Sequence, residues 1–320
     1  MQTRSQSRKL RLEDIAVAHV DADAQKALTP PSSASQSLLP SNSPPTSRDS
    51  SLPPSKFTFR GHIFLDNDSR RWRINDPLSA VKYQQENGPC EATQVFTCIC
   101  LDDAVDDVSE SVVKIKYQVR ATRFTIQRLA DRILNTKEYL KTFPNTNDEE
   151  LAFYEKKLHD CTEPTNTPNY MTYEEMYALD QLAEKKCEHT PWFIDCSYGI
   201  VPPGLDDYAI VGGFVAFLLM TKVPGRSLTY EEYCGKSDAE RNEIRLAFKE
   251  ALEAVSACYI ESCDKAIRNI VWDEEERKCY IVDFEYVAFL DDRDPLPPWT
   301  NKQYKLWELA TDAEADNDNE

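Results

Sequence analysis

The stretch from residue 258 to residue 289, CYIESCDKAIRNIVWDEEERKCYIVDFEYVAF, constrains the fold of this chain most. Two apolar runs, Ile270–Trp272 and Cys279–Val282, flank a short charged segment. Two such runs separated by a polar turn predict a β-hairpin whose loop is longer than two residues. Pairing of the two strands would bring Asn269 and Asp283, at the open end of the hairpin, close together.

Three side chains around this hairpin suit phosphoryl transfer. Asp264 and Asn269 bracket a short loop before the first strand, and Asp283 follows the second strand. Magnesium bound to a phosphoryl donor takes hard oxygen ligands, usually one or two protein groups together with the phosphates. A further carboxylate is needed to orient the attacking hydroxyl and to accept its proton. An ordinary hairpin with polar turns and no ligand is the alternative interpretation.

The order of these residues resembles a known family. Asp264-Lys-Ala-Ile-Arg-Asn269, a strand pair and then Asp283-Phe284 are similar to the catalytic loop and metal-binding segment of the protein-kinase-like fold. The resemblance is to its divergent fungal and aminoglycoside-phosphotransferase-like branches. It implies ATP and Mg²⁺ as cofactors, with Asp264 as the catalytic base and with Asn269 and Asp283 as metal ligands.

Three departures from the family pattern lie in the same segment. Ser262 stands where relatives have His, Cys263 stands at the Arg position, and Glu285 is the third residue of the D-F-G triplet. Ser262, Glu285 and the missing glycines of the family's phosphate loop favour a catalytically impaired, pseudokinase-like module that binds nucleotide or a partner protein. The complete Asp264, Asn269 and Asp283 set favours an enzyme, since a scaffold has no chemical need for it.

The resemblance also implies a domain organisation. We expect an α+β, bilobal fold with a mainly antiparallel β small lobe over residues 56–220 and a helical insertion at about 121–169. The large lobe, over residues 221–310, would be mainly helical and shortened. Residues 1–55, rich in Ser and Pro, and the acidic residues 311–320 are predicted to be disordered tails.

The segment Ser111–Gln118, SVVKIKYQ, predicts a strand with two candidate phosphate-binding lysines. Lys114 and Lys116 share one face, because side chains on a strand alternate with a period of two. Lys114 is preferred, since it directly follows an apolar pair, as the lysine of the family does. Two lysines on a solvent-facing strand are the alternative.

A helix over Tyr173–Cys187 offers a partner for that lysine. Glu175 resembles the family's helical Glu that pairs with the strand lysine, but Thr172 and Glu175 also match a T-x-x-E capping box. The sequence leaves both roles open for Glu175. Further helices are predicted over about Phe124–Thr142 and Asp148–His159.

Three other regions complete the prediction. Residues 209–223 predict two strands, and the second, Val215–Met220, leads into a segment that resembles the adenine-binding hinge of kinases, with Met220 and Lys222 as cofactor-binding candidates. The same stretch would be a core strand and a turn even without adenine.

The loop Glu86–Cys90 occupies the place of the family's glycine-rich phosphate loop but contains a single Gly, so its contribution to nucleotide binding would be weak. A capping box at Ser237 opens a long helix before Asp264, and Asn301–Ala310 predicts a final amphipathic helix.

Composition and net charge limit the classes of molecule that this protein is expected to bind. The formal charge of −18 and the pI of about 4.7 argue against nucleic acid or a membrane surface as partner. The ten cysteines form no C-x-x-C pair, which favours free thiols in a reducing, intracellular compartment, cytoplasmic or nuclear. The expected partners are a nucleotide and a protein or small-molecule phosphate acceptor that the sequence does not name. A glycosidase would need two carboxylates across a sugar cleft, and no pair is singled out by spacing.

Overall fold

The computed structural model describes residues 57–85, 88–102, 110–143, 148–293 and 295–311. The chain divides into two compact units, residues 1–53 and 54–320, and the first lies wholly outside the described residues. The predictions for the tail 1–55 and for residues 312–320 therefore concern parts of the chain that are not described.

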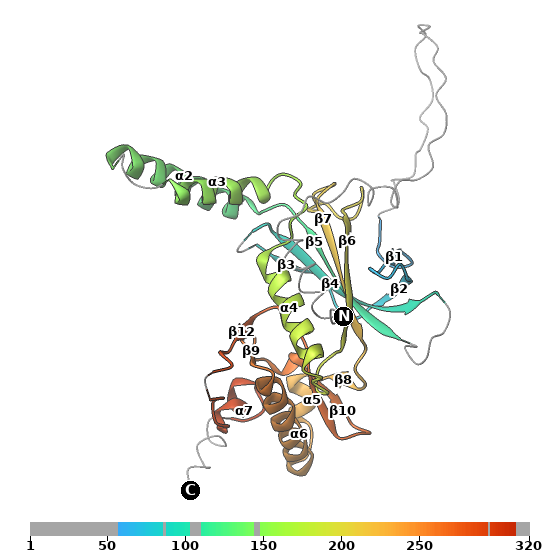
Figure 1. The fold of residues 1–320 in the computed structure, drawn as a ribbon. Coiled ribbons are helices and arrows are strands. Elements are labelled where there is room, and N and C mark those ends of the chain that lie inside the picture. The colour runs from blue at the N-terminus through green and yellow to red at the C-terminus, as the bar shows by residue number, and fades with distance from the viewer. Residues whose placement is uncertain (1–56, 86–87, 103–109, 144–147, 294, 312–320) are drawn as a thin grey trace. The chain divides into compact units, whose positions relative to one another are not determined.

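The larger unit contains a seven-stranded sheet in which every neighbouring pair is antiparallel (Figure 1). The strand order is β1-β2-β4-β5-β7-β6, and β3 pairs with β4 beside β2. Together with the helices, this sheet agrees with the predicted α+β class. The strands are β1 Ile63–Leu65, β2 Arg71–Pro77, β3 Lys82–Gln84, β4 Glu91–Cys100, β5 Ser111–Gln118, β6 Phe193–Ile200 and β7 Phe214–Thr221.

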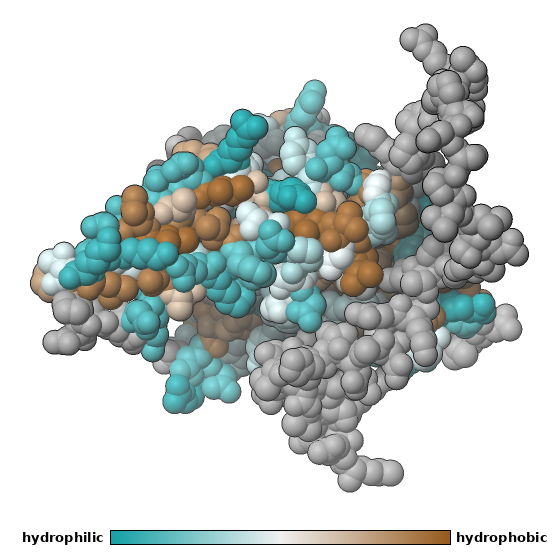
Figure 2. Space-filling model, turned by 90° about the horizontal axis from the view of Figure 1, so that it is seen from above, coloured by the Kyte–Doolittle hydropathy of each residue, from teal (hydrophilic) through white to brown (hydrophobic). Residues whose placement is uncertain are grey.

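Three helices lie between β5 and β6 in the sequence: α2 Arg123–Thr142, α3 Glu149–Asp160 and α4 Tyr170–Glu184. The first two pack on each other and extend away from the sheet (Figure 1). Figure 2 shows apolar and polar side chains intermingled over this pair. The helices predicted over about Phe124–Thr142 and Asp148–His159 are confirmed here, although most of their large apolar side chains, such as Phe124 and Phe153, are exposed.

The chain after β7 forms a second group of elements around the long helix α6. The capping box at Ser237 is present, and the predicted hairpin pairs Ile270 with Ile281 and Asp273 with Lys278. The elements are β8 Arg226–Ser227, α5 Tyr230–Cys234, α6 Asp238–Ala257, β9 Ile260–Ser262, the 3₁₀ helix η2 Ile267–Asn269, β10 Ile270–Asp273, β11 Lys278–Ile281, β12 Val287–Phe289 and α7 Lys302–Leu306.

Two details of the sequence-based prediction are wrong. Only the second of two strands predicted over residues 209–223 forms: Gly212 and Gly213 lie in a turn, and Ala209 makes a single bridge to Val119. The final helix is shorter than predicted, at Lys302–Leu306, although the neighbouring Trp307 is fully buried as an anchor. Among the described helices, none has both the length and the apolar composition needed to cross a bilayer.

The two central strands β5 and β7, which lead to the site, are the most deeply buried strands of the seven-stranded sheet. Strand β7 is buried along nearly its whole length between β5 and β6, which suits its unbroken apolar sequence. Strand β5 is also almost completely buried, although it carries two lysines. Burial of a charged side chain costs several kcal/mol unless it is paired, so these lysines must have anionic partners.

Candidate active site

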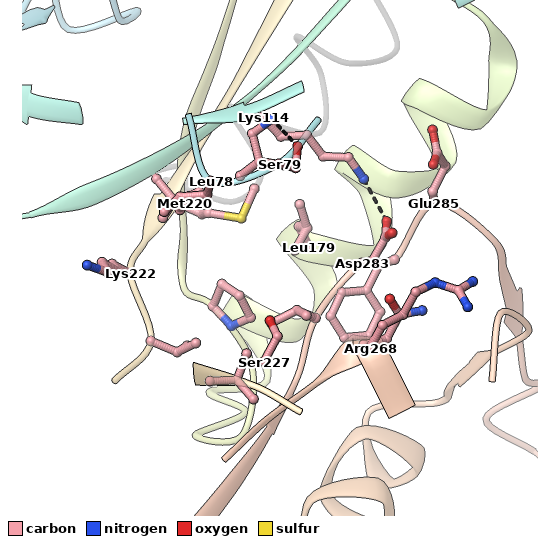
Figure 3. Close-up of a pocket in the computed structure, with 18 of the residues that line it drawn as sticks. Leu78, Ser79, Lys114, Leu179, Met220, Lys222, Ser227, Arg268, Asp283 and Glu285 are labelled. Atoms are coloured by element: carbon pink, nitrogen blue, oxygen red, sulfur yellow. Dashed lines mark hydrogen bonds and ion pairs between the residues drawn. The ribbon is translucent and has the colours of Figure 1, made fainter. Parts of the chain in front are cut away.

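A pocket of about 560 Å³ lies beside the ends of β3, β4, β5 and β7, opposite the hairpin β10–β11. Its walls include apolar side chains such as Leu78 and Leu179. Lys114, Asp283 and Glu285 lie toward one side of the pocket, and Lys222 lies at the other (Figure 3). The pocket therefore combines an apolar compartment with a charged end. This is the usual composition of a site for a small molecule that carries both kinds of group.

Lys114 is the centre of the charged end. Its ammonium donates to Glu175 Oε1 at 2.6 Å and to Asp283 Oδ1 at 2.7 Å. The contact with Asp283 is drawn in Figure 3. The three residues come from β5, from α4 and from the segment after β11, and 169 positions separate Lys114 from Asp283. The structure thus brings together three residues that the sequence analysis selected separately.

The ion pairs determine the charge states in this cluster. Burial alone would raise the pKa of Asp283, but the ammonium groups of Lys114, Lys82 and Lys116 outweigh it and hold the pKa well below its usual range. Burial would lower the pKa of Lys114, yet the carboxylates of Asp283, Glu175 and Glu285 raise it well above its usual value. Lysine and carboxylate are both ionised at neutral pH.

Asp283 also has an unusual backbone conformation. Its φ angle is +67°, in the left-handed region that residues with a side chain rarely adopt. A residue in this region costs of order 1–3 kcal/mol and persists only where its surroundings fix it. The ion pair with Lys114 and the burial of the neighbouring Phe284 supply such surroundings.

Lys116 forms a second buried ion pair beside the first. It is fully buried, and its ammonium lies 2.8 Å from Glu285 Oε1 and 2.9 Å from Glu175 Oε2. Glu175 therefore lies between the two lysines of β5, as their shared strand face predicts. Lys114 lines the pocket, whereas Lys116 is not among the pocket residues of the described chain. Glu285, a departure from the family pattern, is explained structurally as the partner of Lys116.

The role of Glu175 as a helix cap is wrong. Helix α4 begins at Tyr170, three residues earlier than predicted, and its N-cap is Asn169, whose side chain accepts from Met171 N–H at 3.1 Å. Thr172 lies inside the helix and donates its hydroxyl to the buried carboxylate of Glu91 at 2.7 Å. Because the helix starts at Tyr170, Glu175 lies inside it and not at its N-terminus. Its carboxylate contacts Lys114 and Lys116.

Asp264 lies in a partly exposed loop and makes its contacts with residues of the same loop. Both of its carboxylate oxygens are 2.8 Å from the same guanidinium nitrogen of Arg268, and Oδ2 also accepts from the Asn269 amide at 3.1 Å. The Asn269 amide bonds the Asp264 carbonyl as well, at 2.9 Å. About a third of the Asp264 side chain stays exposed, 35%. The carboxylate can therefore still be reached by another molecule.

Asn269 and Asp283 lie close together, as the hairpin predicted. The backbone N–H of Val282 donates to the Asn269 carbonyl at 2.9 Å, and both Asn269 and Asp283 line the pocket. One carboxylate and one amide oxygen are a suitable donor set for Mg²⁺ that also binds phosphates. Within the described part of the chain, no group of three His, Cys, Asp or Glu side chains is placed to hold a metal by itself. A Mg²⁺ ion here would complete its coordination with waters or with oxygens of a bound phosphate.

The two residues predicted for adenine binding lie on the opposite side of the pocket from Asp283 (Figure 3). Met220, at the end of β7, is nearly buried, and Lys222 follows it and binds Glu110 through its side chain at 2.6 Å. The chain leaves the sheet here, after Thr221.

Sequence reasoning missed two residues of this site. Lys82, on β3, lines the pocket and lies 3.7 Å from Asp283 Oδ2, and no motif marks it. Arg268 lies within the segment Asp264–Asn269, and its position four residues after Asp264 permits an ion pair whenever the loop forms a turn. No role is assigned to it from the sequence. The signal for Arg268 was therefore present, and that for Lys82 was not.

Comparisons with known proteins add little. No family model matches the chain, and no curated protein matches it. Among solved structures, a structure of vaccinia related kinase 3 is similar at 12% identity and a TM-score of 0.31, covering 75% of this chain and 53% of that chain. The match thus spans about half the length of that kinase. We draw no conclusion about function from a similarity at this level.

Proposed function

We propose that the pocket binds ATP with Mg²⁺ and that the protein is a phosphotransferase of protein-kinase-like organisation. The observation that carries this proposal is the position of Lys114, buried between Glu175 and Asp283 at the charged end of the pocket. A buried lysine held by a helical glutamate can present a fixed positive charge to phosphate oxygens. Electrostatic positioning of this kind accounts for most of the catalysis of phosphoryl transfer.

Each site residue then has a role. Lys114 binds the donor phosphates, Glu175 orients Lys114, and Met220 and Lys222 lie at the adenine end. Asn269 and Asp283 would hold Mg²⁺, which neutralises developing charge on the phosphates when it is bound.

Asp264 is the proposed base. It accepts the proton of the acceptor hydroxyl while the acceptor oxygen forms its bond to phosphorus and the bond to the departing ADP breaks. The acceptor must approach from the exposed side of the loop, where 35% of the Asp264 side chain is accessible. Residues 56–220 and 221–310 would be the small lobe and the shortened large lobe.

A nucleotide-binding module without catalysis is the second candidate. The specific observation in its favour is that Arg268 contacts both oxygens of Asp264, so that the proposed base is already occupied by an ion pair. The absence of a glycine-rich loop and the Glu285 substitution agree with it.

Nucleotide binding is tested by thermal unfolding of the full chain with millimolar ATP, with Mg²⁺ and with EDTA. A ligand that binds only the folded state stabilises it by about 2.7 kcal/mol at a hundred times its Kd, so the Tm should rise with ATP and rise further with Mg²⁺. Mg²⁺ without nucleotide is the control and should have little effect. An unchanged Tm at millimolar ATP in both conditions would exclude both candidates.

A further inference from the structure

The described residues of the connection between β3 and β4, Gln85 and residues 88–90, make their contacts away from the charged end of the pocket. None of these described residues lines the pocket. Gln85 instead accepts from the Thr122 N–H at 2.7 Å, and a Cβ added to Gly88 would lie 2.6 Å from Cys161 Sγ. Gly88 is therefore required by close packing against the end of α3. These described residues are attached to the α2–α3 insertion, and a glycine at this position is not evidence of phosphate binding.

Lys82 is the residue of β3 that reaches the charged end. Its backbone pairs with Thr93 of β4, and its ammonium lies 3.7 Å from Asp283 Oδ2. Lys114 binds the other oxygen, Oδ1, of the same carboxylate. The two lysines thus approach Asp283 from different strands of the sheet.

The side chains of Lys82 and Lys114 differ in how strongly their contacts restrain them. Lys114 is buried, with 7% of its side chain exposed, and is held by Glu175, whereas 61% of the Lys82 side chain is exposed. A contact of 3.7 Å with one carboxylate is weak and restrains a long side chain little. Lys82 can therefore move its ammonium from Asp283 to an arriving anion without leaving a buried charge unpaired.

The charges of the cluster favour this exchange. Counted over their ion pairs, the two buried lysines, Lys114 and Lys116, face three carboxylates, those of Glu175, Asp283 and Glu285, which leaves one negative charge in excess. The buried carboxyl of Glu91, whose pKa is raised by burial, also faces Lys116. Lys82 balances the excess negative charge. A polyphosphate approaching the pocket would be repelled by the cluster without Lys82, and would be attracted by its exposed ammonium.

We propose that Lys82 binds the donor phosphates directly and replaces the backbone amides that a glycine-rich loop would supply. This inference deepens the proposed function and depends on it. The chemical class recognised is a nucleoside di- or triphosphate. Within the pocket, Lys114 would hold the phosphates from the sheet floor, and Lys82 from the exposed strand β3.

The test compares binding of adenosine, ADP and ATP, first in EDTA and then with Mg²⁺, to the wild type, Lys82→Met and Lys82→Arg by calorimetric titration. Loss of one charge-assisted hydrogen bond should raise the Kd of Lys82→Met for ADP and ATP roughly tenfold and leave adenosine binding unchanged. Lys82→Arg keeps the charge and should stay within about threefold of wild type. Lys141→Met is the matched control, because Lys141 is an exposed lysine on α2, 70% accessible and paired with Glu138.

The outcomes separate this inference from the proposed function. Failure of the wild type to bind ADP or ATP, both in EDTA and with Mg²⁺, would overturn both. Wild-type binding with an unchanged Kd in Lys82→Met would overturn the role of Lys82 alone. So would an equal loss for adenosine, which would indicate a distorted pocket, or a loss that appears only with Mg²⁺, which would indicate an effect through Asp283.

Discussion

The ion-pair cluster of β5 and the loop around Asp264 contain similar groups in opposite settings. In the cluster, Lys114 and Lys116 are buried and their partners lie 59 to 169 positions away. In the loop, the partly exposed Asp264 binds the exposed Arg268 and the buried Asn269, four and five residues away. Buried charges cannot exchange a lost partner for water, whereas exposed charges can. The cluster should therefore dominate stability and nucleotide binding, and the loop should affect chemistry with little effect on folding.

The largest expected effect is on the free energy of unfolding. Lys116→Met leaves Glu285 and one oxygen of Glu175 buried without their cation, and breaking a buried ion pair typically costs about 3–5 kcal/mol. Urea denaturation measures this loss. Lys137→Met is the control, since Lys137 and Glu155 form an exposed pair that should contribute less than about 1 kcal/mol.

The companion variant Lys116→Met/Glu285→Leu tests the cause of that loss. Removing both partners should recover part of the stability, because no carboxylate at position 285 is then left buried without a cation. Equal stability of Lys116→Met and the wild type would show that the buried ion pairs of β5 contribute no more to stability than the exposed pair of the Asp264 loop.

The next prediction separates nucleotide binding from chemistry. Asp283→Asn removes a carboxylate charge from the proposed metal site, so it should weaken Mg²⁺-dependent ATP binding roughly tenfold or more and abolish transfer. Asp264→Asn removes the proposed base and should keep the ATP-induced rise in Tm while transfer falls about 10²–10⁴-fold. Titration with Mg²⁺·ATP and a transfer or ATP-hydrolysis assay measure the two effects.

Two results would change this assignment. Equal weakening of ATP binding by Asp264→Asn and Asp283→Asn would mean that the loop contributes to the metal site. Absence of transfer or hydrolysis by the wild type with diverse acceptors, despite ATP binding, would favour the module without catalysis.

The smallest effect is expected for Arg268→Ala. The pair with Asp264 is exposed and four residues apart, and such pairs contribute about 0.3–0.5 kcal/mol, so unfolding in urea should be almost unchanged. A loss comparable to that of Lys116→Met would contradict the distinction between the two regions.

The sequence alone determined the local features of this protein. The hairpin after Asn269, the capping box at Ser237 and the strand Ser111–Gln118 formed as predicted, because turn chemistry, capping and apolar periodicity act between residues close in the chain. The proximity of Asn269 and Asp283 followed from the hairpin.

Only the tertiary structure decided which charged groups meet. The sequence left Lys114 and Lys116 as alternatives and gave Glu175 two roles, and the structure places Glu175 in contact with both lysines. It also pairs Lys116 with Glu285 and brings Lys82 to Asp283, which no motif indicated. The physical reason is that ion pairs form across the buried interface of β5, α4 and the segment after β11, and the packing of these distant elements, not their local sequence, determines the distances.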